Sequence, residues 1–407
     1  MNKCAVVAFP GNNCEVETSR AATRNGFETT IFLWNQIEEF KAFNPDFIIL
    51  PGGFSFEDRG RSGVLASKAK IFDVIREFAK KGTVILGICN GAQMVVESAL
   101  IPLEIALAKN VRRDDNGHVL GTGFYNEWVY LKPENKNSAF TKFVKNNTLK
   151  VPVAHGEGRF VTREQSSLNK LESGENVAFR YCDEEGNVSP KFPITPNGSN
   201  FAVAGICNTE GTVCAMMPHP ERFFDNCDGD QILKSVYQFI EAGEAPSTVE
   251  IGDFTKLKTP EIHEFSAPDG TTLLEKKLII TDNENFSVRA GACSICNTEI
   301  DLEKSILFEI TGDVDSQKLI DSGLILNENK EFLLEKPSST RKLAVKEYED
   351  DEADHLSDQL TEMFGTDIKV KLYKCWDFGS TSDSNIENII ESRLLANPNS
   401  AEIFEVK

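Results

Sequence analysis

The chain has 407 residues, of which 40% are hydrophobic, and its formal net charge is −20. Nucleic acids and anionic membrane surfaces repel a protein this acidic, so we expect neither as a partner. No apolar stretch approaches the roughly 20 residues that a membrane-spanning helix needs. The length predicts two or three domains.

The start of the chain and its cysteines bear on where the protein works. Residues 1–3 lead directly into a strand-like run, without a charged segment and a removable apolar one. The ten cysteines are scattered, and several lie inside apolar runs. This pattern favours reduced thiols over a disulfide framework, so we expect a cytoplasmic protein.

Short apolar runs alternate with segments of helical spacing at the start of the chain. The expected strands are 4–9, 29–34, 47–50 and 83–86, and the expected helices are 15–25 and 64–80. Strands that are apolar throughout and alternate with helices predict an α/β fold, in which helices cover both faces of a parallel sheet. Ligands bind such sheets beyond the carboxyl ends of the strands.

One cysteine stands at such an end. The segment Gly87-Ile88-Cys89-Asn90-Gly91 follows an apolar run and precedes a helical pattern. Gly-x-Cys-x-Gly at a strand-to-helix junction is typical of a nucleophile elbow. Glycines permit the sharp turn, and the helix N-terminus favours a thiolate. The alternative is a buried, inert cysteine at a tight turn.

Backbone donors for an oxyanion are expected at the same edge of the sheet. The amide of Asn90 points where an oxyanion would form. Pro51-Gly52-Gly53 ends the neighbouring strand, so Gly53 is a candidate for a second donor. Taken alone, the Gly-Gly pair is equally consistent with a simple turn.

A thiolate nucleophile needs a base, and the chain has five histidines. His219 stands between two prolines in Pro218-His219-Pro220-Glu221, which keeps the backbone extended. On extended backbone the side chains of His219 and Glu221 point the same way, so the carboxylate can orient the imidazole towards Cys89. The alternative is a loop histidine beside a surface glutamate.

Taken together, the elbow and the Pro-His-Pro-Glu segment resemble those of class I (triad) glutamine amidotransferases. Five further stretches narrow the resemblance to the glutaminase component of phosphoribosylformylglycinamidine synthase, an enzyme of purine biosynthesis. They are 9–14, 51–55, 154–160, 196–199 and 204–208. The resemblance covers roughly residues 1–243, and it implies a flavodoxin-like glutaminase domain over 1–245.

The resemblance also implies a reaction. Cys89 would attack the side-chain amide of glutamine, giving a glutamyl thioester and ammonia. His219 would relay protons, and Glu221 would orient it. The backbone amides of Gly53 and Asn90 would hold the oxyanion.

Two further residues are implied at the glutamine site. Gln93 stands where family members contact the bound glutamine, and His155 lies in the stretch Ala154-His155-Gly156-Glu157-Gly158. His155 is also an alternative base, although the family places this stretch near the glutamine site and the partner face rather than in the triad.

Family members pass their ammonia to a synthetase subunit that uses ATP to convert formylglycinamide ribonucleotide to formylglycinamidine ribonucleotide. This chain has no Gly-x-x-x-x-Gly-Lys-Ser/Thr loop for phosphate. We therefore expect ATP and Mg on the partner, and neither a cofactor nor a metal on this chain. The alternatives are a triad glutaminase serving another synthetase, a cysteine hydrolase on the same scaffold, and a non-enzymatic interaction protein.

The middle stretch, 250–338, is expected to be a small α+β region of unknown role. Its expected strands are 277–281, 305–309 and 331–334, and its expected helix is 314–322. Cys293 and Cys296 form a Cys-x-x-Cys pair inside a strand-like run. Zinc needs four ligands and no second pair stands nearby, so we expect these thiols to pack in a core.

The last stretch, 341–407, is expected to be a second α+β unit. The expected strands are 342–348, 368–378 and 401–406, and the expected helices are 354–364 and 385–395. Its end is similar to the small bridging subunit of the same synthase, mainly through Leu394-Leu395-Ala396-Asn397-Pro398. The resemblance implies either a separate bridging subunit as a partner or a fused equivalent in 341–407. Fusion would keep the adaptor at high effective concentration.

Overall fold

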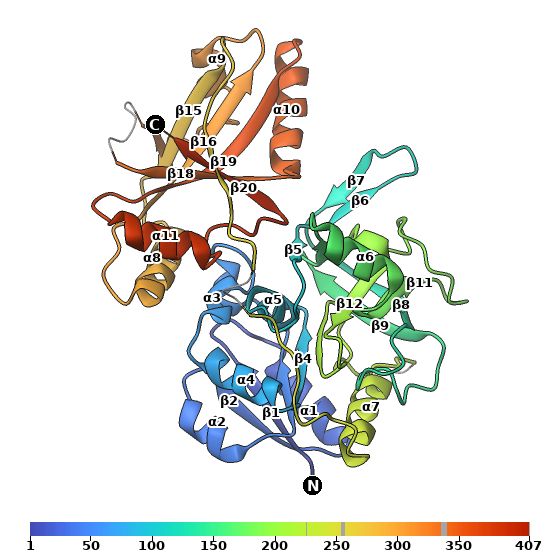
Figure 1. Ribbon diagram of the computed structural model, residues 1–407. Coiled ribbons are helices and arrows are strands. Elements are labelled where there is room, and N and C mark those ends of the chain that lie inside the picture. Colours follow the sequence, from blue (N-terminus) through green and yellow to red (C-terminus); the bar gives the residue numbers. More distant parts are fainter. Residues whose placement is uncertain (225, 254–256, 335–339, 407) are drawn as a thin grey trace. The chain divides into compact units, whose positions relative to one another are not determined.

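The computed structural model describes residues 1–224, 226–253, 257–334 and 340–406. The chain divides into two compact units, Met1–Leu257 and Lys258–Lys407 (Figure 1). The boundary lies a little beyond residue 245, where the sequence analysis ends the first domain. None of the helices in the described ranges is long and apolar enough to cross a bilayer.

A nine-stranded mixed sheet forms the centre of the first unit, in the order β2-β1-β3-β4-β13-β12-β11-β8-β9. Five neighbouring strands are parallel: β2 (Glu28–Leu33), β1 (Lys3–Ala8), β3 (Phe47–Leu50), β4 (Val84–Ile88) and β13 (Val213–Met216). The other four run antiparallel: β12 (Val203–Cys207), β11 (Val177–Cys182), β8 (Tyr125–Pro133) and β9 (Leu149–His155). The predicted α/β class is confirmed, but the sheet is mixed rather than parallel throughout.

The parallel strands are apolar because both of their faces are covered. Every residue of β3 and β4 is buried, which a sheet with one wet face would not allow. The helices of this unit are α1 (Glu15–Arg24), α2 (Ile37–Phe43), α3 (Val64–Ser67), α4 (Ile71–Lys80), α5 (Asn90–Glu97), α6 (Gln165–Ser173) and α7 (Asp230–Glu241). Two short antiparallel two-stranded sheets complete it: β5 (Ala106–Ala108) with β10 (Arg159–Val161), and β6 (Val111–Arg113) with β7 (Val119–Thr122).

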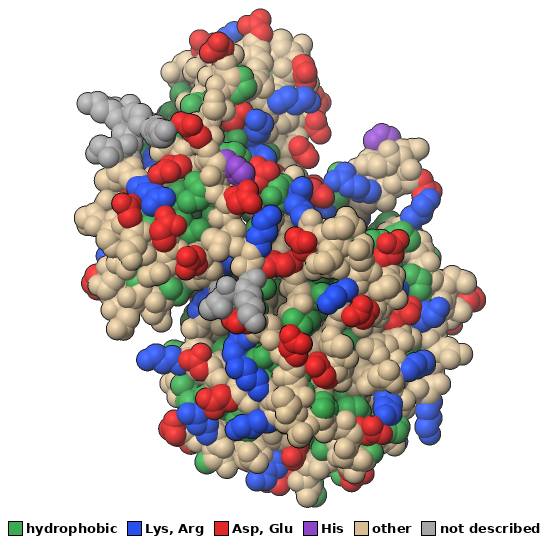
Figure 2. Space-filling model, in the orientation of Figure 1, with side chains coloured by type: hydrophobic (Ala, Val, Ile, Leu, Met, Phe, Trp, Pro, Cys, Tyr) green, Lys and Arg blue, Asp and Glu red, His purple; other side chains and the backbone are tan. Residues whose placement is uncertain are grey.

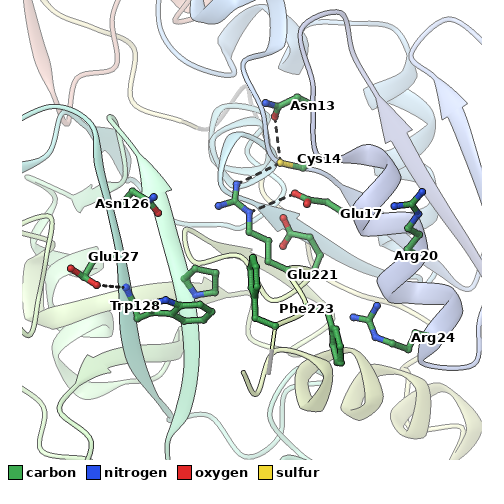
Figure 3. Close-up of a pocket in the computed structure, with 13 residues that line it drawn as sticks. Asn13, Cys14, Glu17, Arg20, Arg24, Asn126, Glu127, Trp128, Glu221 and Phe223 are labelled. Carbon is green, nitrogen blue, oxygen red and sulfur yellow. Dashed lines mark hydrogen bonds and ion pairs between the residues drawn. The ribbon is translucent and has the colours of Figure 1, made fainter. Parts of the chain in front are cut away.

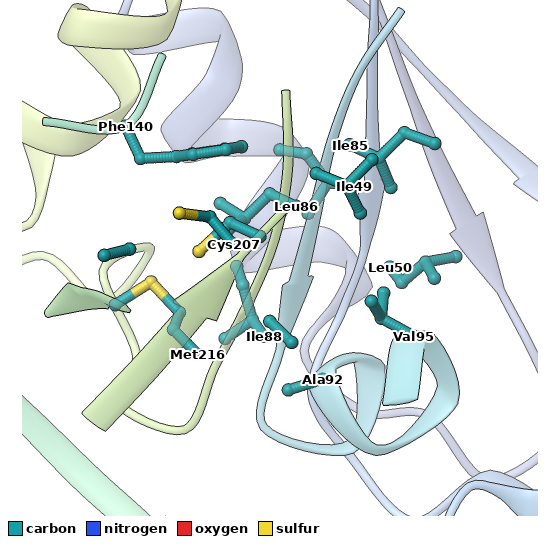
Figure 4. Close-up of a cluster of buried hydrophobic side chains, with 14 of the residues drawn as sticks. Ile49, Leu50, Ile85, Leu86, Ile88, Ala92, Val95, Phe140, Cys207 and Met216 are labelled. Atoms are coloured by element: carbon teal, nitrogen blue, oxygen red, sulfur yellow. The ribbon is translucent and has the colours of Figure 1, made fainter. Parts of the chain in front are cut away.

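A single apolar core fixes the sheet against its helices. Side chains from β3, β4 and β13 meet Ala92 and Val95 of α5 in this core, and Figure 4 shows part of the cluster. Burying one valine, leucine or isoleucine side chain contributes about 2 kcal/mol to the stability of the fold. The carboxyl end of β4, where Cys89 lies, is therefore anchored in this core.

The second unit has its own seven-stranded sheet, in the order β14-β20-β18-β19-β16-β15-β17. Its strands are β14 (Ile262–Glu264), β15 (Thr272–Leu278), β16 (Glu303–Thr311), β17 (Glu331–Leu333), β18 (Lys342–Glu347), β19 (Lys369–Asp377) and β20 (Ala401–Val406). Its helices are α8 (Asn283–Cys296), α9 (Ser316–Asp321), α10 (Asp351–Phe364) and α11 (Asp383–Glu391). The stretches 250–338 and 341–407 were expected to form two α+β units, whereas strands from both stretches form this one sheet. Residues 335–338 lie outside the described residues.

Helix α8 differs from the sequence-based expectation. The Cys-x-x-Cys pair was expected inside a strand, but Cys293 and Cys296 lie in the last turn of α8, so that interpretation is wrong. Only Val288 and Ala292 are buried among the helix's residues, so its apolar periodicity is weak. Cys293 Sγ accepts a hydrogen bond from the Ile300 amide at 3.3 Å, which is a local structural contact.

The surface matches the composition. Figure 2 shows acidic and basic side chains next to one another on the face in view. Many carboxylates have a nearby cation, for example Arg24 with Asp230 at 2.7 Å. The net charge of −20 is therefore distributed over a mixed surface.

We expect Gly91→Ala to disrupt the β4–α5 junction. A Cβ on Gly91 would lie 1.9 Å from the Leu50 carbonyl oxygen. The backbone would have to move, and we expect the free energy of unfolding to fall by about 3 kcal/mol or more. Chemical denaturation followed by circular dichroism measures this change.

Gly156→Ala is the matched control for that substitution. A Cβ on Gly156 would meet nothing closer than 3.7 Å. Its cost should stay below about 1 kcal/mol. Equal stability of the two variants would show that the close approach of α5 to β3 is not a structural requirement.

Candidate active site

Cys89 lies in a strained turn between β4 and α5. Its φ is 50° and its ψ is −108°, a conformation that residues with a side chain rarely adopt. Such strain persists where the surrounding packing enforces it, and it is concentrated at functional sites. Gly87 and Gly91 allow the turn, because a Cβ on Gly87 would lie 2.4 Å from the Gly91 carbonyl oxygen. The turn has the backbone form expected of a nucleophile elbow.

His219 and Glu221 form a buried pair just beyond β13, the strand beside β4. His219 Nδ1 lies 2.7 Å from Glu221 Oε1, and both side chains are almost fully buried. The backbone amide of His219 donates to the Pro152 carbonyl of β9 at 2.9 Å, which fixes the segment against the sheet. The side chains of His219 and Glu221 thus point towards each other and are in contact.

The charge state of His219 follows from its neighbours. Burial would lower the pKa of His219, but the carboxylate of Glu221 and the thiols of Cys89 and Cys14 outweigh it and raise the pKa well above its usual value. His219 Nε2 is buried and has no hydrogen bond of ordinary geometry among the described residues. These surroundings therefore favour the protonated imidazole.

The second of these sulfurs belongs to Cys14, which sequence reasoning gave no role. Ligand atoms of Cys14, His219 and Glu221 all lie within 4.8 Å of one another. Cys14 follows β1, another parallel strand, so the carboxyl-end rule could have placed it here. This donor set could also hold a zinc ion, but His219 and Glu221 are bonded to each other.

The two thiols differ in their surroundings. Burial raises the pKa of Cys14, and the charge of Glu221 adds to this effect against the opposing influence of His219. Cys14 also has ordinary backbone angles, with φ at −106°. Cys89 Sγ lies 3.7 Å from the Ala154 carbonyl oxygen on β9, in the strained turn described above. Cys14 also stands at a helix N-terminus, as the N-cap of α1, but it lacks the strained backbone of the elbow.

The two expected oxyanion donors lie on connected segments. Gly53 has a φ of +137° and forms an isolated antiparallel bridge with Asn12. The side-chain oxygen of Asn90 accepts from the Ser55 amide at 3.0 Å. The loop after β3 and the start of α5 are thereby held together, as the oxyanion hypothesis requires.

Gln93 is held by internal hydrogen bonds. Its Oε1 accepts from Asn90 Nδ2 at 2.8 Å, and its Nε2 donates to the Glu157 carbonyl at 2.6 Å. Gln93 thus fixes the 154–158 segment beside the elbow. A direct contact with glutamine would require these bonds to rearrange.

Asp58 is a further residue that sequence reasoning missed. It accepts from Asn90 Nδ2 at 3.1 Å and has a φ of +52°. Burial raises the pKa of Asp58 to about 7, and the nearby charge of Glu157 adds to this shift. The carboxylates of Asp58 and Glu157 thus lie close enough to each other, beside the elbow, for their charges to interact. Only the three-dimensional fold brings residues 58 and 157 together.

His155 is buried at the end of β9, next to Ala154. Its Nδ1 lies 3.2 Å from Asn110 Oδ1 and 3.1 Å from Asn110 Nδ2. Burial, with a smaller effect from the charge of His219, lowers the pKa of His155 to about 3. A ring with so low a pKa is too weakly basic to take a proton from a thiol, so this environment argues against the alternative base.

A pocket of about 930 Å³ opens on the side of the His–Glu pair that carries Cys14 (Figure 3). Cys14, Glu221 and Arg222 line it, together with the exposed aromatic ring of Phe223. Cys89 is not among its lining residues. The pocket therefore borders the side of the pair where Cys14 lies rather than the elbow.

Residues 1–241 match the CobB/CobQ-like glutamine amidotransferase domain. The chain is 40% identical over 229 residues to a phosphoribosylformylglycinamidine synthase subunit PurQ of Methanothrix thermoacetophila, covering 54% of this chain and 87% of the relative. It is 41% identical to the PurQ subunit of Aquifex aeolicus, covering 54% of this chain and 90% of the relative.

Among solved structures, one described as PurLQS from Thermotoga maritima is 32% identical, with a TM-score of 0.47, covering 59% of this chain and 99% of the other. The matched family spans more than half of the chain and includes the elbow and the His–Glu pair. The chain therefore belongs to the PurQ family of glutamine amidotransferases, the glutaminase subunits of phosphoribosylformylglycinamidine synthase.

Proposed function

We propose that Cys89, His219 and Glu221 are the catalytic residues with which this chain hydrolyses glutamine. The observation that carries the proposal is the strained backbone of Cys89, with φ at 50°, at the start of α5. Such a turn presents a sulfur at a helix N-terminus, where backbone dipoles favour negative charge. The protonated His219 lies beside that sulfur and is oriented by Glu221 at 2.7 Å.

The proposed reaction has two steps. The Cys89 sulfur bonds to the side-chain carbonyl carbon of glutamine, and the carbonyl oxygen becomes an oxyanion facing the amides of Gly53 and Asn90. His219 gives its proton to the departing nitrogen, and the C–N bond breaks to release ammonia and leave a thioester. A water molecule then gives a proton to His219 and attacks the thioester, which yields glutamate and the free thiol.

Asp58 and Glu157 are proposed to hold the α-ammonium group of glutamine. They are two carboxylates next to Asn90, and their mutual repulsion contributes to the raised pKa of Asp58. A bound ammonium group would relieve that repulsion and form charge-assisted hydrogen bonds. Gln93 and His155 shape the same region, Gln93 through its bond to the Glu157 carbonyl and His155 through its bond to Asn110.

The ammonia is proposed to pass to a synthetase subunit. The relatives are named as one subunit of phosphoribosylformylglycinamidine synthase, so the remaining chemistry belongs to another polypeptide. ATP and Mg would bind there. The second unit of this chain, which contains 341–407, is proposed as an adaptor that joins glutaminase and synthetase, because its closing stretch resembles the small bridging subunit.

We expect Cys89→Ala to abolish glutamine-dependent formation of formylglycinamidine ribonucleotide by the chain and its synthetase. Synthesis from added ammonia should continue, because only the thioester step is lost. Cys14→Ser is the matched thiol control, and its glutamine-dependent rate should stay within about ten-fold of the wild type. Measuring both rates with both nitrogen sources tests the assignment. Activity in Cys89→Ala together with its loss in Cys14→Ser would make Cys14 the nucleophile.

The KM for glutamine should depend on the ionisation of Asp58. Its pKa is raised to about 7, so the carboxyl group loses its charge as pH falls from 8 to 6, and KM should rise. Asp58→Asn should raise KM about ten-fold at pH 8 and remove this pH dependence, since a charge-assisted hydrogen bond is lost.

Glu57→Gln is the matched control, because Glu57 is an exposed carboxylate on the same loop. It should leave KM and its pH profile unchanged. Steady-state glutamine hydrolysis between pH 6 and 8 provides the measurement. An unchanged KM in Asp58→Asn would remove Asp58 from the substrate site.

A further inference from the structure

Apart from β14, the elements of the second unit occur twice in the same order. The first series is β15-α8-β16-α9-β17, and the second is β18-α10-β19-α11-β20. The long helices α8 and α10 each have 14 residues, and the central strands β16 and β19 each have nine. In both series the first strand pairs antiparallel with the second and with the last.

The two long helices begin and end alike. Asp282 caps α8 by accepting from the amide of Asn285, and Asp350 caps α10 by accepting from the amide of Ala353. Each helix ends at a residue with a left-handed backbone, an asparagine after α8 and a glycine after α10. Matching caps at both ends set the same helix length in both series.

The turns after the short helices match in sequence and in hydrogen bonds. Ser-Gly-Leu-Ile-Leu-Asn-Glu-Asn occupies 322–329, and Ser-Arg-Leu-Leu-Ala-Asn-Pro-Asn occupies 392–399. The serine hydroxyl accepts from the leucine amide two residues on, at 3.1 Å and 3.2 Å respectively. The first asparagine accepts from the amide of the second, at 3.2 Å and 3.0 Å. The second stretch contains the Leu-Leu-Ala-Asn-Pro segment that resembles the small bridging subunit.

The two series meet about a pseudo-two-fold axis. Strands β16 and β19 pair antiparallel over their full length, from Glu303 with Asp377 to Thr311 with Lys369. Leu307 and Tyr373 are each the fifth residue of their strand, and they lie opposite each other. The first residue of each strand therefore faces the last residue of the other strand. This is the pattern of a self-complementary dimer interface.

Each helix pair of the unit combines the two series. Leu319 of α9 packs in one core with Leu356 and Leu360 of α10. Helices α8 and α11 form the second pair, and they pack against each other. Glu284 of α8 binds Lys304 of its own series and Lys374 of the other, both at 2.6 Å. Neither series can bury its helices without the other.

We infer that residues 272–406 are a tandem duplication of one β-α-β-α-β module, folded as a self-complementary pair within a single chain. The inference builds on the proposed adaptor role of the second unit. If the second module is an adaptor, the first module is another copy of it. The chain then supplies both copies, and the synthetase subunit can assemble with this chain without a separate small subunit.

Hydrogen exchange on the full chain tests the shared core. Leu360→Ala lies in the second module and Leu319→Ala in the first, and both side chains are fully buried. Either substitution should speed amide exchange in both β16 and β19 by about thirty-fold or more. The matched control Leu171→Ala, which is equally buried in the first unit, should leave both strands unchanged. Faster exchange in β19 alone for Leu360→Ala would overturn the paired fold.

Reconstitution with the synthetase subunit tests the proposed adaptor role of the two modules. The full chain and its synthetase subunit alone should show glutamine-dependent synthesis and form a stable complex in analytical ultracentrifugation. Reaction of Cys89 with a diazoketone analogue of glutamine reports on the glutaminase separately. Labelling without complex formation would overturn the adaptor pair while leaving the proposed glutaminase reaction of Cys89 intact. Absence of labelling would count against the proposed function, and the exchange result would still decide the duplication.

Discussion

The close approach of α5 to β3 and β4 is the constraint on which the rest of the site depends. Gly87 and Gly91 leave no room for a Cβ, and this packing holds Cys89 in a backbone conformation that it would not adopt alone. The buried β4 and its neighbours supply the rigidity that maintains the strain. The same parallel arrangement brings the ends of β1, β3 and β13 to one edge. Cys14, Gly53 and His219 thereby gather around the turn.

Within that frame, electrostatics assigns different roles to chemically similar groups. Glu221 and two sulfurs raise the pKa of His219, whereas burial lowers the pKa of His155, whose ring contacts Asn110. The two thiols near His219 differ in backbone geometry. Asp58 differs from a surface aspartate because it lies half-buried beside Glu157. Sequence spacing identifies residue types, and local environment separates their functions.

Features that depend on local sequence patterns could be predicted from the sequence, whereas features that depend on contacts between distant residues could not. The strands 4–9, 47–50 and 83–86 were predictable because both faces of a parallel sheet are buried and their residues are apolar throughout. The antiparallel strand β8 carries exposed residues such as Trp128, which interrupt its apolar pattern, and the sequence did not predict it as a strand. Helix α8 was missed because small residues and only two buried positions weaken its periodicity. The contacts of Asp58 and Cys14 join distant segments, which local patterns do not encode.

The internal symmetry of the second unit has an evolutionary consequence. In a dimer of identical chains, every substitution is expressed at two equivalent places, so one end cannot change without the other. Two copies joined in one polypeptide are released from that coupling. The fourth residue of each long helix illustrates the result, since Phe286 is 68% exposed and its counterpart is the acidic, exposed Asp354. One end of the pair can thus specialise for an apolar contact while the other remains solvated.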